Sequence, residues 1–176
     1  NDDTRHYLNG IFIHPTASNK NTYLTGVATD THRLSSSSMQ IQNITKFKPF
    51  ILPKKTVFQL CNLLQENSEN ISLYLGETKI QFKMGNSIIV SKVIDGKFPD
   101  YEKVVPKNNN KILNIKAKDF INSIERVITV SIDRKEGVKM TLDKDSIQLF
   151  VTSSSSGEGN ETLAAKYSSE TLTINF

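Results

Sequence analysis

Apolar and polar residues alternate along much of the first forty positions, a pattern that predicts β-strands. The segments 7–14 and 22–29 are rich in aromatic and β-branched residues, and the turn-forming stretch PTASNKN separates them. Alternation resumes at Met39 and Ile41 after a run of four serines. We therefore predict an antiparallel hairpin with a third strand beside it.

Two later segments change to the apolar spacing of an amphipathic helix. The segment 54–67 follows a short strand, KPFILP at 48–53, and the segment 117–130 follows another, KILNIK at 111–116. The expected apolar faces consist of Val57, Leu60, Cys61 and Leu64 in the first helix and of Phe120, Ile124, Val127 and Ile128 in the second. Each helix therefore has one face that should pack against a sheet.

The two helical segments belong to an internal repeat, because their apolar positions align at one common offset. Strand, helix and antiparallel strands occur in this order at 48–94 and again at 111–176, and 7–41 resembles a third copy without its opening strand and helix. The predicted fold class is therefore α+β, with repeated β-α-β-β-β units whose antiparallel sheets carry helices on one face.

A linker-like stretch, GKFPDYEKVVPKNNNK at 96–111, separates the copies. It has two prolines, little periodicity and a run of asparagines, which is typical of a connection between domains. We place the boundary at 107–111, and we therefore expect one domain at 1–110 and a second at 111–176.

Composition limits the classes of function without choosing one. The 176 residues carry a net charge of +4 with a pI near 9.1, which permits a polyanionic partner but does not require one. Cys61 is the only cysteine, so the chain can form no internal disulfide and no thiolate metal site, which fits a reducing cytosol. No apolar run has the length of a membrane span, and we expect no membrane partner.

The stretch VATDTHRL holds the densest cluster of reactive side chains. Asp30, His32 and Arg33 would suit acid–base catalysis if the imidazole lay between a nucleophile and a carboxylate. Consecutive residues rarely supply that geometry, because neighbours on an extended chain point to opposite faces. The three histidines, which are His6, His14 and His32, lack the spacing of a metal site, so we expect neither a metal nor a cofactor.

Four segments in series resemble one family. They are TRHYLNGIFIH, VATDTHRL, ILPKKTVFQLCNLL and SKVIDGKFPDYEKVVP, in this order along the chain. Together they resemble the bacterial beta sliding clamp, the beta subunit of DNA polymerase III, over the whole chain. The resemblance implies three domains of one architecture, each made of two β-α-β-β-β units. It identifies 1–110 as most of the middle domain, without its first strand and helix, and 111–176 as the first half of the third domain.

The resemblance also implies a function. Two subunits of this family close head to tail into a ring around duplex DNA, with helices lining the hole. The ring holds the catalytic subunit of the replicative polymerase, the clamp loader and repair polymerases, which dock through short linear motifs. The chain would then be a non-catalytic, homodimeric processivity factor, cytoplasmic and associated with the nucleoid. Two alternatives stay open: an unrelated enzyme of DNA metabolism that uses Asp30, His32 and Arg33, and a free-standing peptide-binding module.

The resemblance assigns DNA contacts to basic residues and their neighbours. Lys54 and Lys55 begin the first helix, where the helix dipole disfavours positive charge. Two interpretations compete: the lysines contact DNA phosphates, or they are ordinary solvated surface residues. Lysine suits a sliding contact because it is a flexible, well-hydrated point charge. The candidates are Arg5, His6, Tyr7, Lys54, Lys55 and Lys118, with Arg126 as a further one.

The resemblance places a peptide-binding pocket between the second and third domains. Its walls would consist of Leu8, Thr29, Thr31, His32, Arg33, Leu34, Pro99, Lys103 and Val104. An apolar floor with a few polar groups would orient an extended peptide that inserts Leu and Phe side chains. Thr31 replaces a common glycine, which makes a positive φ angle less accessible there, and Lys103 replaces a common arginine. The rest of the lining would come from the second half of the third domain, so a fragment of this extent should bind peptide poorly.

Overall fold

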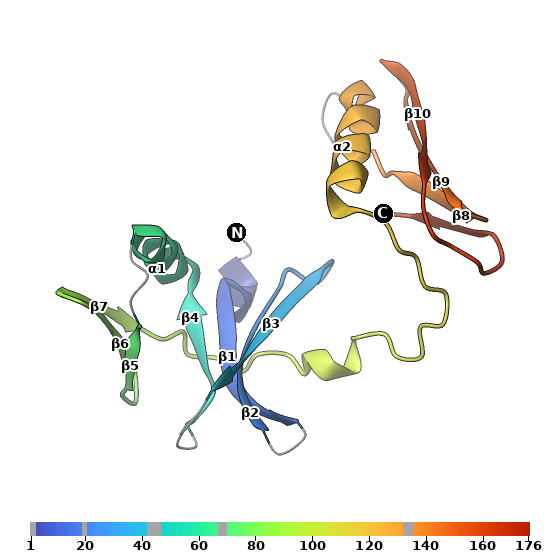
Figure 1. The fold of residues 1–176 in the computed structure, drawn as a ribbon. Helices are drawn as coiled ribbons and strands as arrows, with labels where there is room; N and C mark the ends of the chain where they lie inside the picture. Colours follow the sequence, from blue (N-terminus) through green and yellow to red (C-terminus); the bar gives the residue numbers. More distant parts are fainter. Residues whose placement is uncertain (1–2, 19–20, 42–46, 67–69, 132–135) are drawn as a thin grey trace. The chain divides into compact units, whose positions relative to one another are not determined.

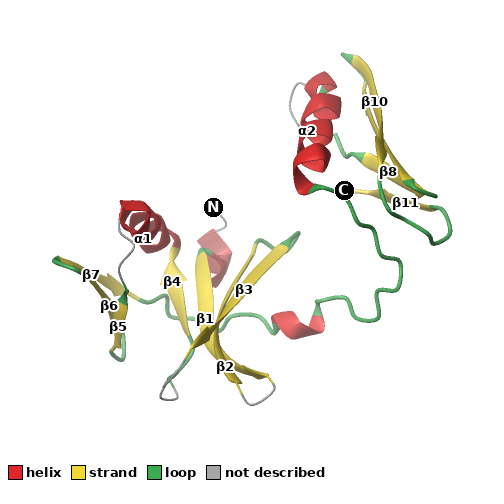
Figure 2. Cartoon of the chain, viewed as in Figure 1, coloured by secondary structure: helices red, strands yellow, loops and turns green. Residues whose placement is uncertain are grey.

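The computed structural model describes residues 3–18, 21–41, 47–66, 70–131 and 136–176. Contacts between residues divide the chain into two compact units, Asn1–Tyr101 and Glu102–Phe176, and each unit is described by itself (Figures 1 and 2). Within the described residues, no helix is long and apolar enough to cross a membrane.

The division between the units falls after Tyr101, ahead of the boundary expected at 107–111. The reason is that the first half of the supposed linker belongs to the core of the first unit. Phe98 is buried, and the Tyr101 hydroxyl lies 3.0 Å from Nε2 of His14. The exposed stretch that follows begins only at Glu102.

The first unit contains a four-stranded antiparallel sheet in the order β3-β2-β1-β4. The strands are β1 (Gly10–Ser18), β2 (Asn21–Thr29), β3 (Leu34–Ile41) and β4 (Phe50–Pro53). The sequence predicted a strand at 7–14, but Asp3–Leu8 form a 3₁₀ helix and β1 continues through Pro15. Proline is tolerated there because β4 pairs with β1 only as far as Ile13, so Pro15 lies beyond this ladder and need not donate to it.

A second sheet of the first unit has the order β5-β6-β7 and packs against the helix α1 (Lys54–Glu66) (Figure 1). Its strands are β5 (Ser72–Leu75), β6 (Lys79–Met84) and β7 (Ser87–Lys92). The core between α1, β4 and β6 consists of Phe50, Leu52, Leu60, Ile80, Phe82 and Met84. One helix thus covers parts of two sheets.

The buried face of α1 differs from the predicted one. Leu60 is buried and Leu63 packs against the core, whereas Cys61 and Leu64 are exposed. The face is rotated because Thr56 belongs to it, although a threonine counts as polar in the pattern. Its hydroxyl is buried and lies 2.7 Å from the Ser91 hydroxyl of β7. This hydrogen bond compensates for the loss of water on burial.

A smaller cluster covers the other face of the first sheet. Val27, Ile51 and Phe98 are buried together, and the ring of Phe98 stacks on that of Phe12 with 4.8 Å between centroids. An isolated β-bridge between Ile51 of β4 and Ile94 holds the backbone that precedes Phe98 against the first sheet. The segment 94–101 is therefore packed on the sheet rather than being an open linker.

The second unit consists of the helix α2 (Ala117–Val127), a 3₁₀ turn at Ile128–Val130, and one antiparallel sheet in the order β10-β9-β8-β11. The strands are β8 (Lys139–Asp143), β9 (Ser146–Ser153), β10 (Gly157–Ala164) and β11 (Leu172–Asn175). The predicted apolar face, which consists of Phe120, Ile124, Val127 and Ile128, packs on this sheet. Figure 1 shows α2 beside the sheet. The strand predicted at 111–116 is wrong: only an isolated bridge joins Asn114 to Lys166. The predicted α+β class is confirmed.

Candidate functional site

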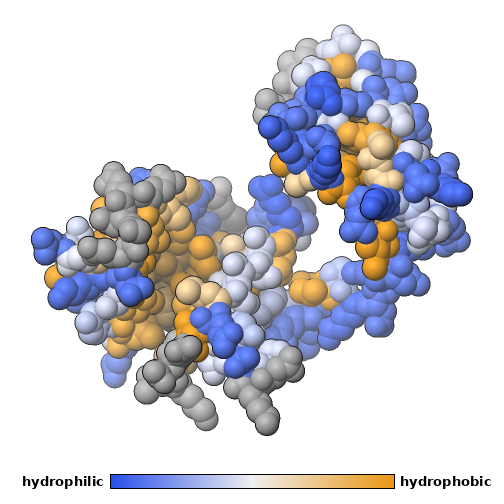
Figure 3. Space-filling view, in the orientation of Figure 1, coloured by the Kyte–Doolittle hydropathy of each residue, from blue (hydrophilic) through white to orange (hydrophobic). Residues whose placement is uncertain are grey.

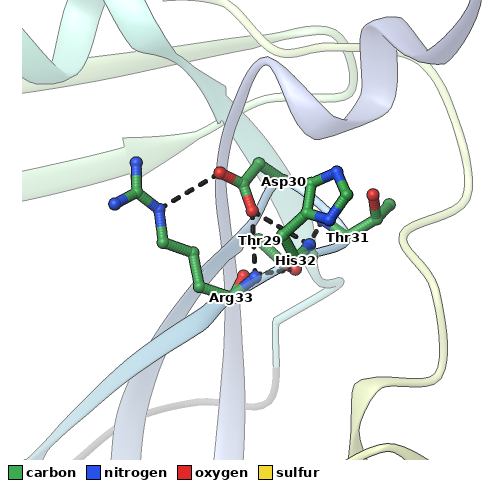
Figure 4. Close-up of polar contacts among 5 residues, drawn as sticks. All are labelled: Thr29, Asp30, Thr31, His32 and Arg33. Carbon is green, nitrogen blue, oxygen red and sulfur yellow. Dashed lines mark hydrogen bonds and ion pairs between the residues drawn. The ribbon is translucent and has the colours of Figure 1, made fainter. Parts of the chain in front are cut away.

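The loop between β2 and β3 is fixed by hydrogen bonds among its own residues (Figure 4). The Thr29 hydroxyl donates to the Arg33 carbonyl oxygen at 2.7 Å and accepts from the Thr31 amide at 3.1 Å. One carboxylate oxygen of Asp30 accepts from the amides of His32 and Arg33, at 3.1 and 3.0 Å. The side chains of Thr29 and Asp30 thereby supply hydrogen-bond partners for most of the backbone amides of the loop.

Asp30 has a structural role in this arrangement. The amides of Arg33 and His32 hold the pKa of its carboxyl below the usual value, so it is ionised at neutral pH. Its other oxygen accepts from Arg33 Nε at 3.1 Å. A catalytic triad would direct the carboxylate at the imidazole, whereas here it is directed at the backbone and a guanidinium (Figure 4). The geometry favours a carboxylate that orders the loop over one that activates His32.

Thr31 adopts a left-handed backbone conformation, with a φ of 76°. The substitution of threonine for glycine was expected to make this conformation less accessible, yet the loop adopts it. The left-handed region costs a residue with a Cβ about 1–2 kcal/mol, and the surrounding hydrogen bonds offset that cost. The hydroxyl of Thr31 also lies 3.5 Å from Nη1 of Arg5.

A hollow of about 600 Å³ opens beside the loop. Its polar rim includes Arg5, Thr29, Asp30, Arg33 and Lys54, and its apolar lining comes from Leu8, Ile11, Ala28, Leu34, Val57 and Phe58. The space-filling view shows apolar surface gathered around β4 in the first unit (Figure 3). The hollow therefore combines an apolar floor with charged and hydroxyl groups at its margin.

The structure brings together part of the predicted peptide pocket. Leu8, Thr29, Arg33 and Leu34 line the hollow, although 20 residues separate the first two in the sequence. The side chains of Thr31 and His32 are exposed on the loop outside this lining. Pro99 is exposed on the segment packed over the first sheet, and Lys103 and Val104 belong to the second unit.

Two of the predicted DNA-contacting residues share this hollow. Arg5 and Lys54 are part of its lining, and Nζ of Lys54 lies 5.8 Å from the centre of the Phe58 ring. Lys55 is exposed on the first turn of α1. His6 Nε2 lies 2.9 Å from the Asp95 carbonyl oxygen.

Tyr7 packs against the small core around Phe98, so its ring is half-buried. In the second unit, Lys118 is exposed on the first turn of α2. Arg126 near the other end of the same helix donates to the Glu161 carboxylate and, at 2.8 Å, to the Ser123 hydroxyl. Arg126 is thus engaged in the fold, whereas Lys118 projects from it.

Among the residues of the hollow that the sequence did not assign to a site, Gly10 and Phe58 do most to shape it. Gly10 ends the YLNG motif and lets β1 approach β4, because a Cβ there would lie 2.2 Å from the Leu52 carbonyl oxygen. Phe58 is 59% exposed on α1, outside the apolar face of that helix. The sequence did contain a signal for Phe58, because an aromatic residue outside the apolar face of a helix indicates an exposed contact site. In the described ranges, no three His, Cys, Asp or Glu side chains lie close enough to share a metal ion.

Comparison with known proteins decides the family. The model described as DNA polymerase III beta subunit, central domain, matches residues 1–100, and the one described as its C-terminal domain matches residues 102–176. The chain belongs to the DNA polymerase III beta subunit family. The resemblance read from the four segments is therefore confirmed.

Individual beta subunits are similar over the whole of this chain. The beta sliding clamps of Caulobacter vibrioides NA1000 and Haemophilus influenzae are 34% and 30% identical to it, over 99% and 100% of its length. The match covers 47% of each of those proteins, so the chain spans about half the length of the curated relatives it matches.

Solved beta subunit structures share the fold. A sliding clamp from Bartonella birtlesii, crystallised with griselimycin bound, aligns with a TM-score of 0.93 and 38% identity. The clamp of Caulobacter crescentus aligns with a TM-score of 0.91 and 34% identity. Each alignment covers 99% of this chain and 47% of the other. The clamp fold expected from the sequence is therefore confirmed.

Proposed function

We propose that this chain is part of a DNA sliding clamp, the processivity factor of a bacterial replicative polymerase. We further propose that the loop 29–33 and the hollow beside it form one wall of the site at which partner proteins dock. The observation that carries the second proposal is that Leu8, Thr29, Arg33 and Leu34 surround one hollow in a member of the beta subunit family.

The chemistry of the hollow suits an extended peptide with apolar anchors. Leu8 and Leu34 offer an apolar floor, and burial of a leucine or phenylalanine there would contribute about 1.5–3 kcal/mol. The guanidinium of Arg33 is oriented by Asp30 and is otherwise exposed, so it can donate to a carbonyl or carboxylate of the peptide. The solved Bartonella clamp shows that a family member binds a ligand, griselimycin.

The whole protein would act by enclosing DNA rather than by catalysis. Two subunits would form a ring around duplex DNA in the cytoplasm, associated with the nucleoid, and would hold a polymerase, a clamp loader and repair polymerases. Lys55 and Lys118 support the DNA contact, since each is exposed on the first turn of a helix. Charge without base-reading geometry would give binding that is independent of sequence and sensitive to salt.

A peptide titration tests the docking site. A fluorescein-labelled peptide of about ten residues with Leu and Phe anchors is titrated with a full-length clamp that contains this chain, and anisotropy is measured. Arg33→Ala and Leu34→Ala should each weaken binding about tenfold, because each removes one contact worth about 1.4 kcal/mol. Lys144→Ala, an exposed cation of the second unit, is the matched control for Arg33 and should have no effect. Equal affinity in all four proteins would exclude this site.

His32→Ala separates docking from catalysis. The docking proposal expects weaker peptide binding and no turnover of nucleic acid in either protein. A hydrolytic or transfer activity that the substitution abolishes would instead support the enzyme hypothesis. The exposed position of His32 makes the variant informative, because its removal leaves no cavity in the core.

DNA contact is tested without disturbing the hollow. Lys54 lines the hollow, so its replacement would mix the two effects, and Lys55→Glu and Lys118→Glu are the cleaner variants. Both should weaken retention of the ring on circular duplex DNA more at low salt than at high salt, because salt screens the phosphate contacts that they remove, with peptide affinity unchanged. A fall in peptide affinity of the same size would show that the two surfaces are not separate.

A further inference from the structure

The three-stranded sheet β5-β6-β7 has one covered face and one uncovered face. On β6, Ile80, Phe82 and Met84 are buried against the core beneath α1. Because side chains alternate along a strand, Lys79 and Lys83 point to the opposite face, and both are exposed. Figure 3 shows hydrophilic residues at the margin of the first unit where this sheet lies.

Cross-strand pairing identifies the neighbours on the uncovered face. Gln81 pairs with Tyr74 of β5 and with Val90 of β7, so the three side chains form one row. Lys83 pairs with Ile88 in the next row. Tyr74 is 55% exposed, and Ile88 and Val90 are each 58% exposed. A shallow hollow of about 300 Å³ lies over part of this face, with Tyr74, Lys79, Gln81 and Val90 in its lining.

The charge of the face has one sign. Lys79 pairs with Lys92, so three lysines surround the apolar side chains, and the strands β5, β6 and β7 contain no aspartate or glutamate. Glu77 stands in the turn between β5 and β6, beyond the end of the paired rows. Like charges placed opposite each other destabilise a sheet, as at the Lys79–Lys92 pair. An acidic partner would neutralise these lysines and so complement the charge of the face.

The row of the second unit that corresponds to Tyr74, Gln81 and Val90 has a different character, although the next row pairs Lys139 with Phe150. Thr141 of β8 pairs with Gln148 of β9, which pairs with Thr162 of β10, so that row is uncharged and polar. Such a row is what a solvated face normally presents. A row of exposed tyrosine and valine flanked by lysines is therefore a property of the β5-β6-β7 sheet and not of the repeat.

We propose that this surface, the lysine–valine face, docks an acidic and partly apolar polypeptide segment of a partner protein. The lysine–valine face consists of Tyr74, Lys79, Lys83, Ile88, Val90 and Lys92. An extended segment that alternates acidic and apolar side chains would match the rows, since strand side chains on one face repeat every second residue. This docking face lies on the side of the sheet away from α1 and contains none of the residues assigned to the hollow.

A protein partner fits this face better than a nucleic acid. Bases stack on aromatic rings, and Tyr74 is the one aromatic residue of the lysine–valine face. Ile88 and Val90 have no ring to offer, and their exposed area would instead be buried against leucine or phenylalanine of a polypeptide.

The test uses a fluorescein-labelled peptide of about 12 residues that alternates Asp and Glu with Leu and Phe, against a matched peptide with Asn and Gln. The 176-residue chain should bind the acidic peptide several-fold more tightly than the neutral one, whose Leu and Phe side chains can still enter the hollow beside the loop 29–33. Lys83→Glu combined with Lys92→Glu should weaken binding about tenfold, as two surface charge pairs are reversed. Lys139→Glu combined with Lys144→Glu changes the net charge equally in the second unit and should leave the affinity unchanged.

A second variant and a map of the contact complete the test. Val90→Asn keeps every lysine and should still weaken binding several-fold, and hydrogen exchange should slow in β6 and β7 when the acidic peptide is added. Equal binding of both peptides, or equal loss in the two double variants, would overturn the proposal. The proposal would also be overturned if the chain bound a DNA duplex of about 20 base pairs, or anionic vesicles, through Lys83 and Lys92 and did not bind the acidic peptide.

Discussion

Gly10 offers the sharpest test of how the hollow is built. It starts β1 at the point where β4 leads into α1, and the Lys54 amide donates to the Asn9 carbonyl oxygen beside it at 3.0 Å. A Cβ on Gly10 would lie 2.2 Å from the Leu52 carbonyl oxygen and 3.1 Å from Cγ2 of Ile51. The nearer neighbour is backbone, so it cannot rotate away. Gly10→Ala must therefore push β1 and β4 apart by about 1 Å.

The expected cost follows from three effects. Overpacking of a well-packed site costs about 1–3 kcal/mol, and loss of a strand-pairing hydrogen bond costs about 0.5–1.5 kcal/mol. Alanine also lowers the conformational entropy of the unfolded chain, which raises the free energy of unfolding by about 0.4–1 kcal/mol. We therefore expect Gly10→Ala to reduce the free energy of unfolding of the first unit by about 2 kcal/mol, which speeds exchange through global unfolding about thirtyfold.

Hydrogen exchange followed by mass spectrometry separates the two units and is the assay of choice. Amides of β1 and β4 should lose protection, whereas those of β8 and β9 serve as an internal control. The matched variant is Gly137→Ala, whose Cβ would meet the Phe176 carbonyl oxygen at an ordinary 3.5 Å. If both variants changed protection equally, the close approach at Gly10 would not be what limits this position.

Three further changes probe the fold and the loop. Arg126 and Ser123 lower the pKa of Glu161 to about 2 from 4.5, so their stabilisation should be complete above pH 4.5 and fade as the pH falls towards 2. Glu161→Gln should flatten that part of the pH dependence of exchange in the second unit. Thr31→Gly removes left-handed strain but gives the unfolded chain more conformational freedom, so the free energy of unfolding in urea should rise by about 0–1.5 kcal/mol. A clear fall in that free energy would contradict the strain. Leu149→Ala, at a fully buried position, should cost about 2–5 kcal/mol and destabilise only the second unit.

Much of the fold could be predicted because the pattern of burial was simple. The apolar spacing of α2 predicted its packing correctly, since one sheet covers one continuous face. The face of α1 was misplaced because the helix contacts two sheets and buries Thr56, whose hydroxyl is satisfied by Ser91. Periodicity alone cannot distinguish a buried, hydrogen-bonded threonine from a solvated one.

The site was less predictable than the fold. The family resemblance grouped Leu8 with Thr29 and Leu34 because those positions follow the motif, and the three residues line one hollow. The closeness of Lys54 and Phe58 to them depends on where α1 begins relative to β1, and that is fixed by contacts distant in the sequence. The sequence also did not reveal that Thr31 would adopt a positive φ, because the stabilising bonds come from Thr29 and Asp30 together.

The hydrogen bonds of the loop 29–33 have a consequence for how such a site can diverge. Thr29 and Asp30 fix the backbone, while the imidazole of His32 and the outer guanidinium of Arg33 face solvent. Thr29 and Asp30 thus set the shape of the loop and also line the hollow, whereas the side chain of His32 does neither. Substitutions at His32 can accumulate during evolution without disturbing the sheet, so the exposed side chain can change while the scaffold stays the same. For the same reason, the five residues 29–33 could be grafted into another protein between two antiparallel strands with the same spacing.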